Sequence, residues 1–358
     1  MTTKMRMKKT LATLALSALL ASTGLASAGE TVGPNGEKAT PSSALTLSDA
    51  EIAKLKDGKY TAALLWHTSS DFVTAVTAGA TDTFKKYGIE VVAETDAGFD
   101  SAKQLSDVET VLAKKPSVIL ALPLDPVGSA AAFKPAVEGG VKLVFLSNVP
   151  AGYTQGKDYV SIVTDDLFQM GKQAGDALAT ALGDKGKVAY IFHDAQYYVT
   201  NQRDQAFKAT IENDHKGMTI VDSQGIADPA RAEEIANALL TKTPDLDGIY
   251  VTWAEPAEGV LAALRQAGNT HTKIGTLDLS EPVGLDMVKG GTVTARVADK
   301  AYDLGSAMAT AAAYGLLGKE APAFVVAPAI TVQKDNVVDG WKASLNREPP
   351  QSILDAIK

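Results

Sequence analysis

From about residue 60 onward, short apolar segments alternate with longer segments whose apolar residues recur at helical spacing. Residues 61–66 are almost wholly apolar, as expected of a strand that is buried on both faces of a sheet. Residues 71–87 follow with helical spacing, and Gly88 ends this predicted helix. Strands that alternate with helices in this way form parallel sheets with right-handed crossovers. The pattern therefore predicts an α/β protein.

This alternation runs through the chain twice, once up to about residue 162 and again from about residue 163. Two such runs predict two doubly wound, Rossmann-like lobes, and 358 residues are enough for two domains. The alternative is one large Rossmann-like enzyme domain. Its single sheet would need about ten strands, the upper limit for open twisted sheets, so we favour two lobes.

Residues 1–28 have the composition of an export signal. A basic segment contains Lys4, Arg6, Lys8 and Lys9, and an apolar segment follows over residues 11–26. The small residues Ala26-Ser27-Ala28 match the positions that a signal peptidase reads, so we expect cleavage after Ala28. The mature protein is then expected in the periplasm.

Residues 29–57 precede the first predicted lobe. Gly, Pro, Ser and Thr are abundant over residues 29–47, which predicts a flexible arm. Ser48 and Glu51 have the spacing of a capping box, and they are expected to open a short helix that ends near Lys56.

Composition argues against several classes of function. The formal net charge is −8, which disfavours binding to nucleic acid or to anionic membranes. The sequence has no cysteine, which excludes disulfides, a thiolate nucleophile, thiolate zinc sites and a lipid anchor on cysteine. After the export signal, no apolar run reaches the roughly 18 residues that a membrane span needs. A globular exported protein is the expectation.

Motifs for catalysis and cofactor binding are missing. Residues 67–71 read His-Thr-Ser-Ser-Asp where a dinucleotide-binding protein would have its glycine-rich turn, and there is no Walker loop or nucleophile elbow. His193-Asp194 could belong to a catalytic triad, but no elbow serine accompanies the pair. The four histidines lack zinc spacing, and the acidic loops lack EF-hand spacing for calcium. We expect a binding protein with no cofactor or metal, and an exported α/β hydrolase is the less favoured alternative.

Aromatic, polar and acidic residues recur directly after the predicted strands. Ligands of parallel sheets bind at the carboxyl ends of the strands. Aromatic rings pack on the apolar faces of sugars, while carboxylates and amides bind hydroxyl groups. The residues expected to contact a ligand are His67, Asp71, Phe72, Asp125, Ser147, Asn148, Arg203, Trp253, Glu255, Asp278 and Asp299.

Seven of these residues also have a purely structural interpretation. Helix caps and turns favour aspartate, large aromatic residues fill cores, and a single arginine is commonly a solvated surface charge. The structural alternatives are a cap or turn for Asp71, Asp125, Asp278 and Asp299, core packing for His67 and Trp253, and solvent exposure for Arg203.

Several short stretches occur in a distinctive order. They are Ser70-Asp71-Phe72 with Gly79, Gln104, residues 122–126 (Leu-Pro-Leu-Asp-Pro), Asp165 with Gly171, Arg203 with Phe207, residues 253–257 (Trp-Ala-Glu-Pro-Ala), and Asp278. With them, the chain over about residues 58–338 resembles the sugar-binding periplasmic proteins of bacterial ABC transporters, of the ribose-binding type (type I periplasmic binding proteins).

This resemblance implies two similar lobes joined by three crossovers. The N-terminal lobe would hold residues 58–162 and 300–330, and the C-terminal lobe residues 163–299 and 331–358. The ligand would lie in the cleft, and closure of the lobes would present a surface to the permease.

The candidate site departs from the family pattern. The resemblance implies contacts from Asp71 and Phe72, Arg203 and Asp278, but the usual Asp-Arg pair is replaced by Ser147-Asn148. This chain differs from the family at four further positions. It has Leu122 where the family commonly has an asparagine, Glu255 where an asparagine or aspartate is usual, Leu277 in place of an aromatic residue and Asp299 in place of a glutamine. The resulting site is acidic, so a neutral sugar, polyol or cyclitol is expected rather than an anion.

The expected partners follow from the same resemblance. They are a small sugar or polyol, the ABC permease in the inner membrane, and a chemoreceptor; no nucleic acid is expected, and the protein is expected to be a monomer. One alternative is a receptor for a cyclitol or furanone-type signalling ligand. Another is the effector domain of a sugar-responsive repressor, which the export signal and the lack of an N-terminal helix-turn-helix disfavour.

Overall fold

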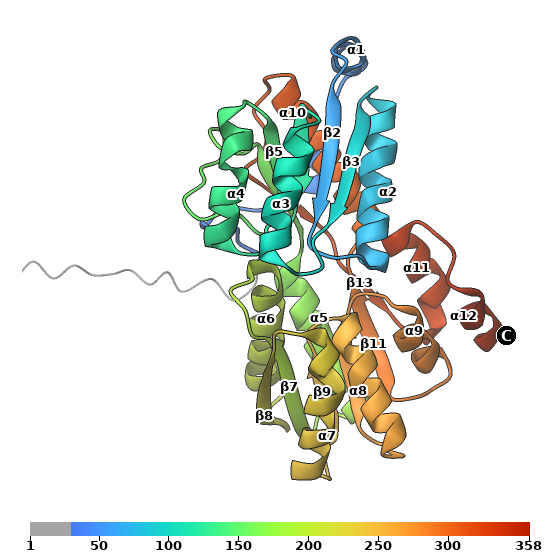
Figure 1. Ribbon diagram of the computed structural model, residues 1–358. Coiled ribbons are helices and arrows are strands. Elements are labelled where there is room, and N and C mark those ends of the chain that lie inside the picture. Colours follow the sequence, from blue (N-terminus) through green and yellow to red (C-terminus); the bar gives the residue numbers. More distant parts are fainter. Residues whose placement is uncertain (1–29) are drawn as a thin grey trace, which may run out of the picture.

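The computed structural model describes residues 30–358 and contains two α/β lobes, one above the other in Figure 1. The export signal predicted over residues 1–28 lies outside the described residues. Each lobe is built on a largely parallel sheet with helices on both faces. The predicted fold class is therefore confirmed. Across residues 30–358, none of the helices combines the length and the hydrophobicity of a membrane span.

The N-terminal lobe, the upper one in Figure 1, has a seven-stranded sheet in the order β1-β12-β6-β5-β4-β2-β3, with every neighbouring pair parallel. Its strands are β1 (Thr40–Pro41), β2 (Thr61–Trp66), β3 (Glu90–Asp96), β4 (Val118–Ala121), β5 (Lys142–Leu146), β6 (Ser161–Asp165) and β12 (Phe324–Ala327). Its helices are η1 (Ser42–Ala44), α1 (Asp49–Asp57), α2 (Asp71–Lys86), α3 (Ser101–Leu112), α4 (Pro126–Glu138) and α10 (Ala301–Leu316).

The C-terminal lobe has a six-stranded sheet in the order β13-β11-β10-β9-β7-β8, in which only β13 runs antiparallel to its neighbour. Its strands are β7 (Gly186–His193), β8 (Met218–Ile226), β9 (Gly248–Val251), β10 (Lys273–Leu277), β11 (Val293–Ala298) and β13 (Ile330–Val332). Its helices are α5 (Leu167–Leu182), α6 (Tyr198–Asp214), η2 (Pro229–Arg231), α7 (Ala232–Lys242), α8 (Ala254–Gln266) and α9 (Glu281–Val288), followed at the C-terminus by η3 (Lys334–Asn336), α11 (Val337–Leu345) and α12 (Gln351–Ala356).

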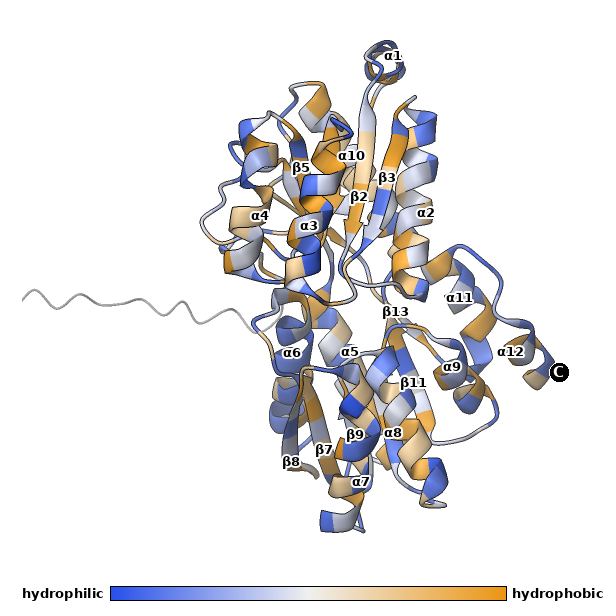
Figure 2. Ribbon diagram, in the orientation of Figure 1, coloured by the Kyte–Doolittle hydropathy of each residue, from blue (hydrophilic) through white to orange (hydrophobic). Residues whose placement is uncertain are grey.

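The central strands are apolar because helices cover both faces of each sheet. Every residue of β4 is buried, and so is every residue of β9. Figure 2 shows hydrophobic residues along β2 and α10, while the outer faces of the helices are mixed or hydrophilic. Burial of this apolar surface is the main favourable contribution to folding.

The helices α2 and α10 pack closely on one face of the N-terminal sheet. A Cβ atom on Gly305 would lie 1.9 Å from the carbonyl oxygen of Val76, and one on Gly79 would lie 2.0 Å from that of Tyr302. Only glycine allows the two backbones to approach this closely.

The chain passes between the two sheets three times, between β6 and α5, between β11 and α10, and between β12 and β13. The sequence predicts one late strand over residues 324–331, whereas the structure has two short strands, one in each sheet. In addition, β6 extends to Asp165, beyond the predicted end of the N-terminal lobe at residue 162, because it pairs with both β5 and β12.

Residues 30–47 differ from the predicted flexible arm. β1 pairs in parallel with β12 and extends the N-terminal sheet by one strand. Thr31 Oγ1 donates a hydrogen bond to Asp166 Oδ1 (2.5 Å) and accepts one from the backbone amide of Phe168 (3.0 Å), at the start of α5 in the other lobe. The arm is held in place because its polar groups find partners at a sheet edge and at a helix start.

Candidate ligand-binding site

A cavity of about 70 Å³ lies between the two lobes, at the carboxyl ends of strands from both sheets. The residues that line it from the N-terminal lobe are His67, Thr68, Ser70, Phe72, Phe99, Leu122, Leu146, Ser147 and Asp165. Those that line it from the C-terminal lobe are His193, Tyr197, Val199, Thr200, Arg203, Trp253, Glu255, Asp278 and Leu279, and Asp299 lies between β11 and α10 where the chain returns to the N-terminal lobe.

Most of the residues predicted to contact a ligand line this cavity. They are His67, Phe72, Ser147, Arg203, Trp253, Glu255, Asp278 and Asp299. They come together because parallel strands of each sheet end at the same edge, and the two edges face each other.

Arg203 and Asp278 form a buried ion pair in the cavity wall. Arg203 Nη1 lies 3.1 Å and 3.4 Å from the two carboxylate oxygens of Asp278, and Arg203 Nη2 donates to the carbonyl oxygen of Thr252 (3.5 Å). Only 5 % of the surface of Arg203 is exposed. The alternative interpretation of Arg203 as a solvent-exposed surface charge is therefore wrong.

The position of Arg203 depends on close packing between α5 and α6. A Cβ atom on Gly171 of α5 would lie 2.1 Å from the backbone oxygen of Arg203. Glycine at this position lets α6 approach α5, and that approach sets how far the guanidinium group reaches into the cavity.

Two of the lining residues at strand ends have left-handed backbone conformations. Ser147 has φ 56° and Asp278 has φ 64°, and both directly follow a strand. Such strain in a non-glycine residue costs of the order of 1 kcal/mol, and it is typical of binding sites. It turns the chain sharply at the sheet edge that faces the cavity.

Two further carboxylates are buried in the lining. Asp165 and Asp299 are 2 % and 3 % exposed, and burial raises the pKa of both carboxyl groups well above their usual range. Their mutual repulsion acts in the same direction. Burial also raises the pKa of Asp278, although the positive charge of Arg203 opposes that shift.

Both histidines in the lining are neutral at physiological pH. Burial lowers the pKa of His67 to about 3, and burial together with the charge of Arg203 lowers that of His193 to about 4. His193 Nδ1 lies 2.7 Å from Thr200 Oγ1 and not against a carboxylate, so the residues His193-Asp194 do not form a triad.

Aromatic rings extend across the cavity from one lobe to the other. The ring of Phe99 lies 5.2 Å from that of His67 in an edge-on arrangement and 6.4 Å from that of Trp253. The ring of His193 lies 5.0 Å from Trp253 and 5.3 Å from Tyr197. These apolar faces are suited to the C–H surface of a sugar or polyol.

Several buried polar atoms in the lining have no hydrogen-bond partner within residues 30–358. They are His67 Nδ1, Asp165 Oδ1, Tyr197 OH and Arg203 Nε. Buried polar atoms are normally paired, so a group of unpaired ones around one cavity indicates a polar ligand.

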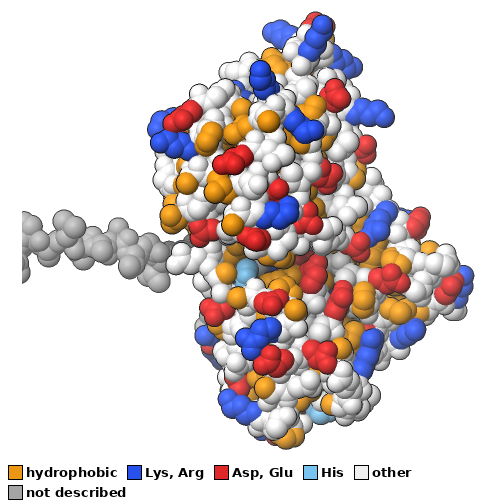
Figure 3. Space-filling view, viewed as in Figure 1, with side chains coloured by type: hydrophobic (Ala, Val, Ile, Leu, Met, Phe, Trp, Pro, Cys, Tyr) orange, Lys and Arg blue, Asp and Glu red, His pale blue; other side chains and the backbone are white. Residues whose placement is uncertain are grey.

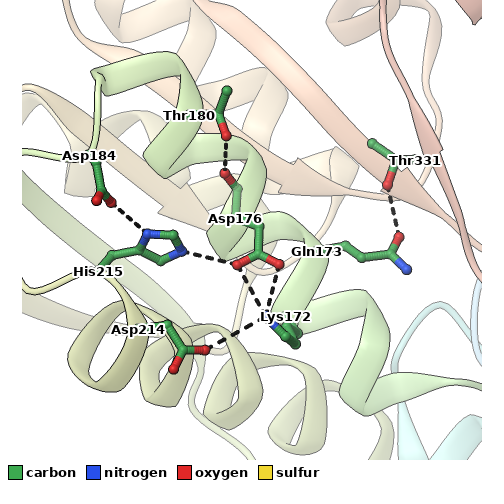
Figure 4. A network of polar contacts seen from close by, with 8 residues as sticks. All are labelled: Lys172, Gln173, Asp176, Thr180, Asp184, Asp214, His215 and Thr331. Carbon is green, nitrogen blue, oxygen red and sulfur yellow. Dashed lines mark hydrogen bonds and ion pairs between the residues drawn. The ribbon is translucent and has the colours of Figure 1, made fainter.

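A polar network surrounds α5 (Figure 4). Lys172 contacts Asp176 (3.0 Å) and Asp214 (3.6 Å), and His215 lies between Asp176 (3.0 Å) and Asp184 (2.6 Å). These contacts join α5 to the end of α6, the helix that carries Arg203. The described residues contain no group of three or more His, Asp or Glu side chains placed to hold a metal ion.

Comparison with known proteins identifies the family. The family model described as the periplasmic binding protein domain matches residues 48–320. The chain belongs to this family. Its members are transport receptors of the periplasm and not enzymes. The match begins after residues 30–47, so the arm is outside it.

The relatives of this periplasmic binding protein include sugar receptors. It is 27 % identical over 269 residues to the ribose import binding protein RbsB of Salmonella typhimurium, covering 75 % of this chain and 88 % of the relative. Its fold matches a solute-binding protein from Agrobacterium vitis bound with α-D-tagatopyranose (TM-score 0.73, 24 % identity, 81 % and 99 % coverage). It also matches one from Mycobacterium smegmatis with bound glycerol (TM-score 0.70, 26 % identity, 78 % and 96 % coverage).

Two of the predicted contact residues lie away from the cavity for local reasons. Asp71 Oδ1 lies 2.5 Å from Arg347 Nη2, in an ion pair between the start of α2 and the C-terminal segment. Asp125 caps α4 by accepting a hydrogen bond from the backbone amide of Gly128. Both carboxylates have partners within the protein.

Asn148 is buried beside the cavity but does not line it. Its Nδ2 donates to the carbonyl oxygen of Pro123 (2.9 Å), and its Oδ1 accepts from the backbone amide of Val199 (3.2 Å). Since Val199 belongs to the other lobe, Asn148 links the lobes directly.

The structure adds lining residues that the sequence did not assign to ligand contact. They are Thr68, Ser70, Phe99, Leu122, Leu146, Asp165, His193, Tyr197, Val199, Thr200 and Leu279. Asp165 ends β6, so the strand-end argument applies to it as well. The strand-end argument does not apply to Phe99, which lies three residues beyond the end of β3. A turn in which Phe99 has φ 60° brings it to the cavity.

Proposed function

We propose that this chain is the exported solute-binding component of an ABC importer, and that it binds a small sugar, polyol or cyclitol between its lobes. One observation carries the proposal: aromatic faces and unpaired buried polar atoms from both lobes meet in a single enclosed cavity. A polyhydroxylated solute offers apolar C–H faces and hydroxyl groups, and so matches both features.

The relatives support this class of ligand. Proteins of similar sequence or fold are named for ribose import or contain a bound tagatopyranose or glycerol. All of these ligands are small and rich in hydroxyl groups. The sequence differences at Ser147, Asn148 and Asp299 argue that the ligand of this chain is not ribose.

Closure of the lobes would couple binding to delivery. The chain passes between the two sheets at three points, and these passages can act as a hinge. A ligand that contacts both lobes favours the closed state, whose surface the permease of an ABC importer would recognise.

The remaining elements of the proposal concern location and partners. Residues 1–28 would direct export, with cleavage after Ala28, and the mature protein would act in the periplasm as a monomer. A chemoreceptor is a second partner for the same closed surface. A receptor for a cyclitol or furanone-type signal is the alternative function.

A thermal-shift screen of the mature protein tests the proposal. The compounds are sugars, acyclic polyols, cyclitols and amino acids. A ligand at 100 times its dissociation constant adds about 2.7 kcal/mol of stability, which raises the melting temperature by several degrees. A rise with one hydroxyl-rich class is the expected result, and a rise with amino acids alone would refute the assignment.

A matched pair of variants locates the binding. Phe72→Ala removes an aromatic face from the cavity lining and is expected to abolish most of the shift. Leu105→Ala, at a residue that is 42 % exposed on α3, is the control and is expected to leave the shift unchanged.

A further inference from the structure

The charges that line the cavity are unbalanced. Its carboxylates are Asp165, Glu255, Asp278 and Asp299, whereas Arg203 is the one cationic side chain of the lining within the described residues. Both histidines of the lining are neutral, as argued above. Arg203 forms its ion pair with Asp278 at 3.1 Å, and among residues 30–358 neither Asp165 nor Asp299 forms an ion pair of its own.

Asp165 and Asp299 occupy related places in the fold. Asp165 ends β6 just before the chain crosses to α5, and Asp299 follows β11 just before the chain crosses to α10. Both carboxylates thus stand at passages between the lobes. Asp165 Oδ1 is buried and has no hydrogen-bond partner among residues 30–358.

We propose that the natural ligand is a cationic, amine-bearing sugar, polyol or cyclitol, whose ammonium group binds beside Asp165 and Asp299. This inference rests on the proposed function and narrows its class of ligand. An ammonium group carries three hydrogen-bond donors and the missing positive charge, and charge-assisted hydrogen bonds are about twice as strong as neutral ones. The aromatic lining would hold the rest of the molecule.

A neutral polyol would satisfy these two residues less well. Its hydroxyl groups can donate to a carboxylate, but they do not offset the repulsion that Asp165 exerts on Asp299 in this buried site. The cavity would then have to keep one carboxyl protonated. An anionic ligand would add a further negative charge.

The surface around the cavity favours the approach of a cation. Figure 3 shows Asp and Glu side chains in clear excess over Lys and Arg along the boundary between the lobes. Glu255 stands at the exposed rim of the cavity itself. A field of this sign raises the rate at which a positively charged solute associates.

Calorimetric titration of the mature wild-type protein with paired compounds tests the inference. Each pair differs in one group, a hydroxyl replaced by an amine: an inositol and its monoamino derivative, and a hexose and its 2-amino derivative. The amine of a pair is expected to bind at least ten-fold more tightly than its hydroxyl partner. Equal or tighter binding of the neutral member would overturn the inference and leave the proposed function intact. Binding of no member of any pair would overturn the inference, and the thermal-shift screen would then decide separately on the proposed function.

Isosteric variants test the assigned residues. Asp165→Asn and Asp299→Asn are each expected to reduce the preference for the amine, that is, the ratio of the two affinities within a pair, several-fold. Asp303→Asn, on the exposed face of α10, is the control and is expected to keep the full preference. An unchanged preference in both cavity variants would overturn the placement of the ammonium group. Should a variant fail to fold, the comparison on the wild-type protein still decides the charge of the ligand.

Discussion

Asn148 Oδ1, at the end of β5 in one lobe, accepts a hydrogen bond from the backbone amide of Val199 in the other lobe, at 3.2 Å. The same side chain donates to Pro123 and is thus fixed by its own lobe. This contact exists only when the lobes are close together. Asn148 therefore acts on the equilibrium between open and closed states, without touching the cavity.

Asn148→Ala is expected to weaken ligand binding about 2- to 10-fold, since one net hydrogen bond contributes roughly 0.5–1.5 kcal/mol. The melting temperature of the ligand-free protein should change little, and small-angle scattering should show a more open average shape. Asn201→Ala is the control, because Asn201 Nδ2 bonds to Ala195 within the same lobe. An affinity equal to that of the wild-type protein would contradict the role given to Asn148.

Arg203→Met is expected to destabilise the protein by about 3–5 kcal/mol, because it leaves the buried carboxylate of Asp278 without its partner. Without the guanidinium group, the pKa of Asp278 rises further above its unfolded value. The penalty is therefore largest at neutral pH and falls as the pH is lowered toward 5.

Urea unfolding at pH 7 and pH 5 measures this effect. Arg265→Met is the control, since Arg265 pairs with Asp286 at 3.1 Å but is 57 % exposed. A loss of stability no larger than that of the control would show that the buried pair is not important for folding.

Gly171→Ala is expected to push α6 away from α5, because the new Cβ atom would lie 2.1 Å from the backbone oxygen of Arg203. Overpacking of this kind costs about 1–3 kcal/mol, and the displaced arginine should also lower the affinity for ligand. Gly175→Ala, on the same helix, meets only the Thr210 side chain at 3.0 Å and should have a smaller effect on both quantities. Equal effects in the two variants would contradict the account.

The stability of the fold is expected to depend on pH through the protonation of His215. Burial alone would lower its pKa, but its contacts with Asp176 and Asp184 outweigh this and raise the pKa above 6.5. The charged form therefore stabilises the fold below about pH 6.5, and this contribution is lost as the pH rises through the folded-state pKa.

His215→Asn should remove this contribution, which for a partly exposed pair is about 0.5–1 kcal/mol. Melting temperatures of the wild-type and variant proteins should differ at pH 6 and converge at higher pH. His271→Asn, at an exposed histidine, is the control. A difference that does not depend on pH would exclude the charge of His215 as its cause.

The arm also links the lobes. Thr31 contacts the start of α5, and the hydroxyl of Tyr198 donates to the carbonyl oxygen of Val32, while β1 belongs to the other sheet. A protein that begins at Ser48 is expected to melt at a lower temperature and to bind ligand more weakly. Unchanged values of both would show that the arm is incidental to closure.

The sequence predicted the fold well because α/β periodicity is local. Buried strands such as β2 appear as continuous apolar runs, and helices such as α2 appear through their spacing. The rule that ligands bind at strand ends also brought most of the predicted contact residues to the cavity, including Trp253 and Asp278.

The rest depended on contacts between distant segments. Whether the Asp71 carboxylate faces a ligand or Arg347 is decided by a residue in the C-terminal segment. The pairing of β1 with β12 joins segments almost 300 residues apart. The division of residues 324–332 between two sheets depends on the pairing of β12 with β6 and of β13 with β11. No local pattern contains this information.

The decisive experiment on ligand binding between the lobes is a crystal structure of the mature protein with the hydroxyl-rich compound that gives the largest thermal shift. The account predicts closed lobes and one ligand molecule in the cavity, packed against Trp253 and bonded to the Arg203–Asp278 pair and to Asp165 Oδ1. A ligand bound at another surface, or a cavity that contains only water while the compound is present, would contradict it.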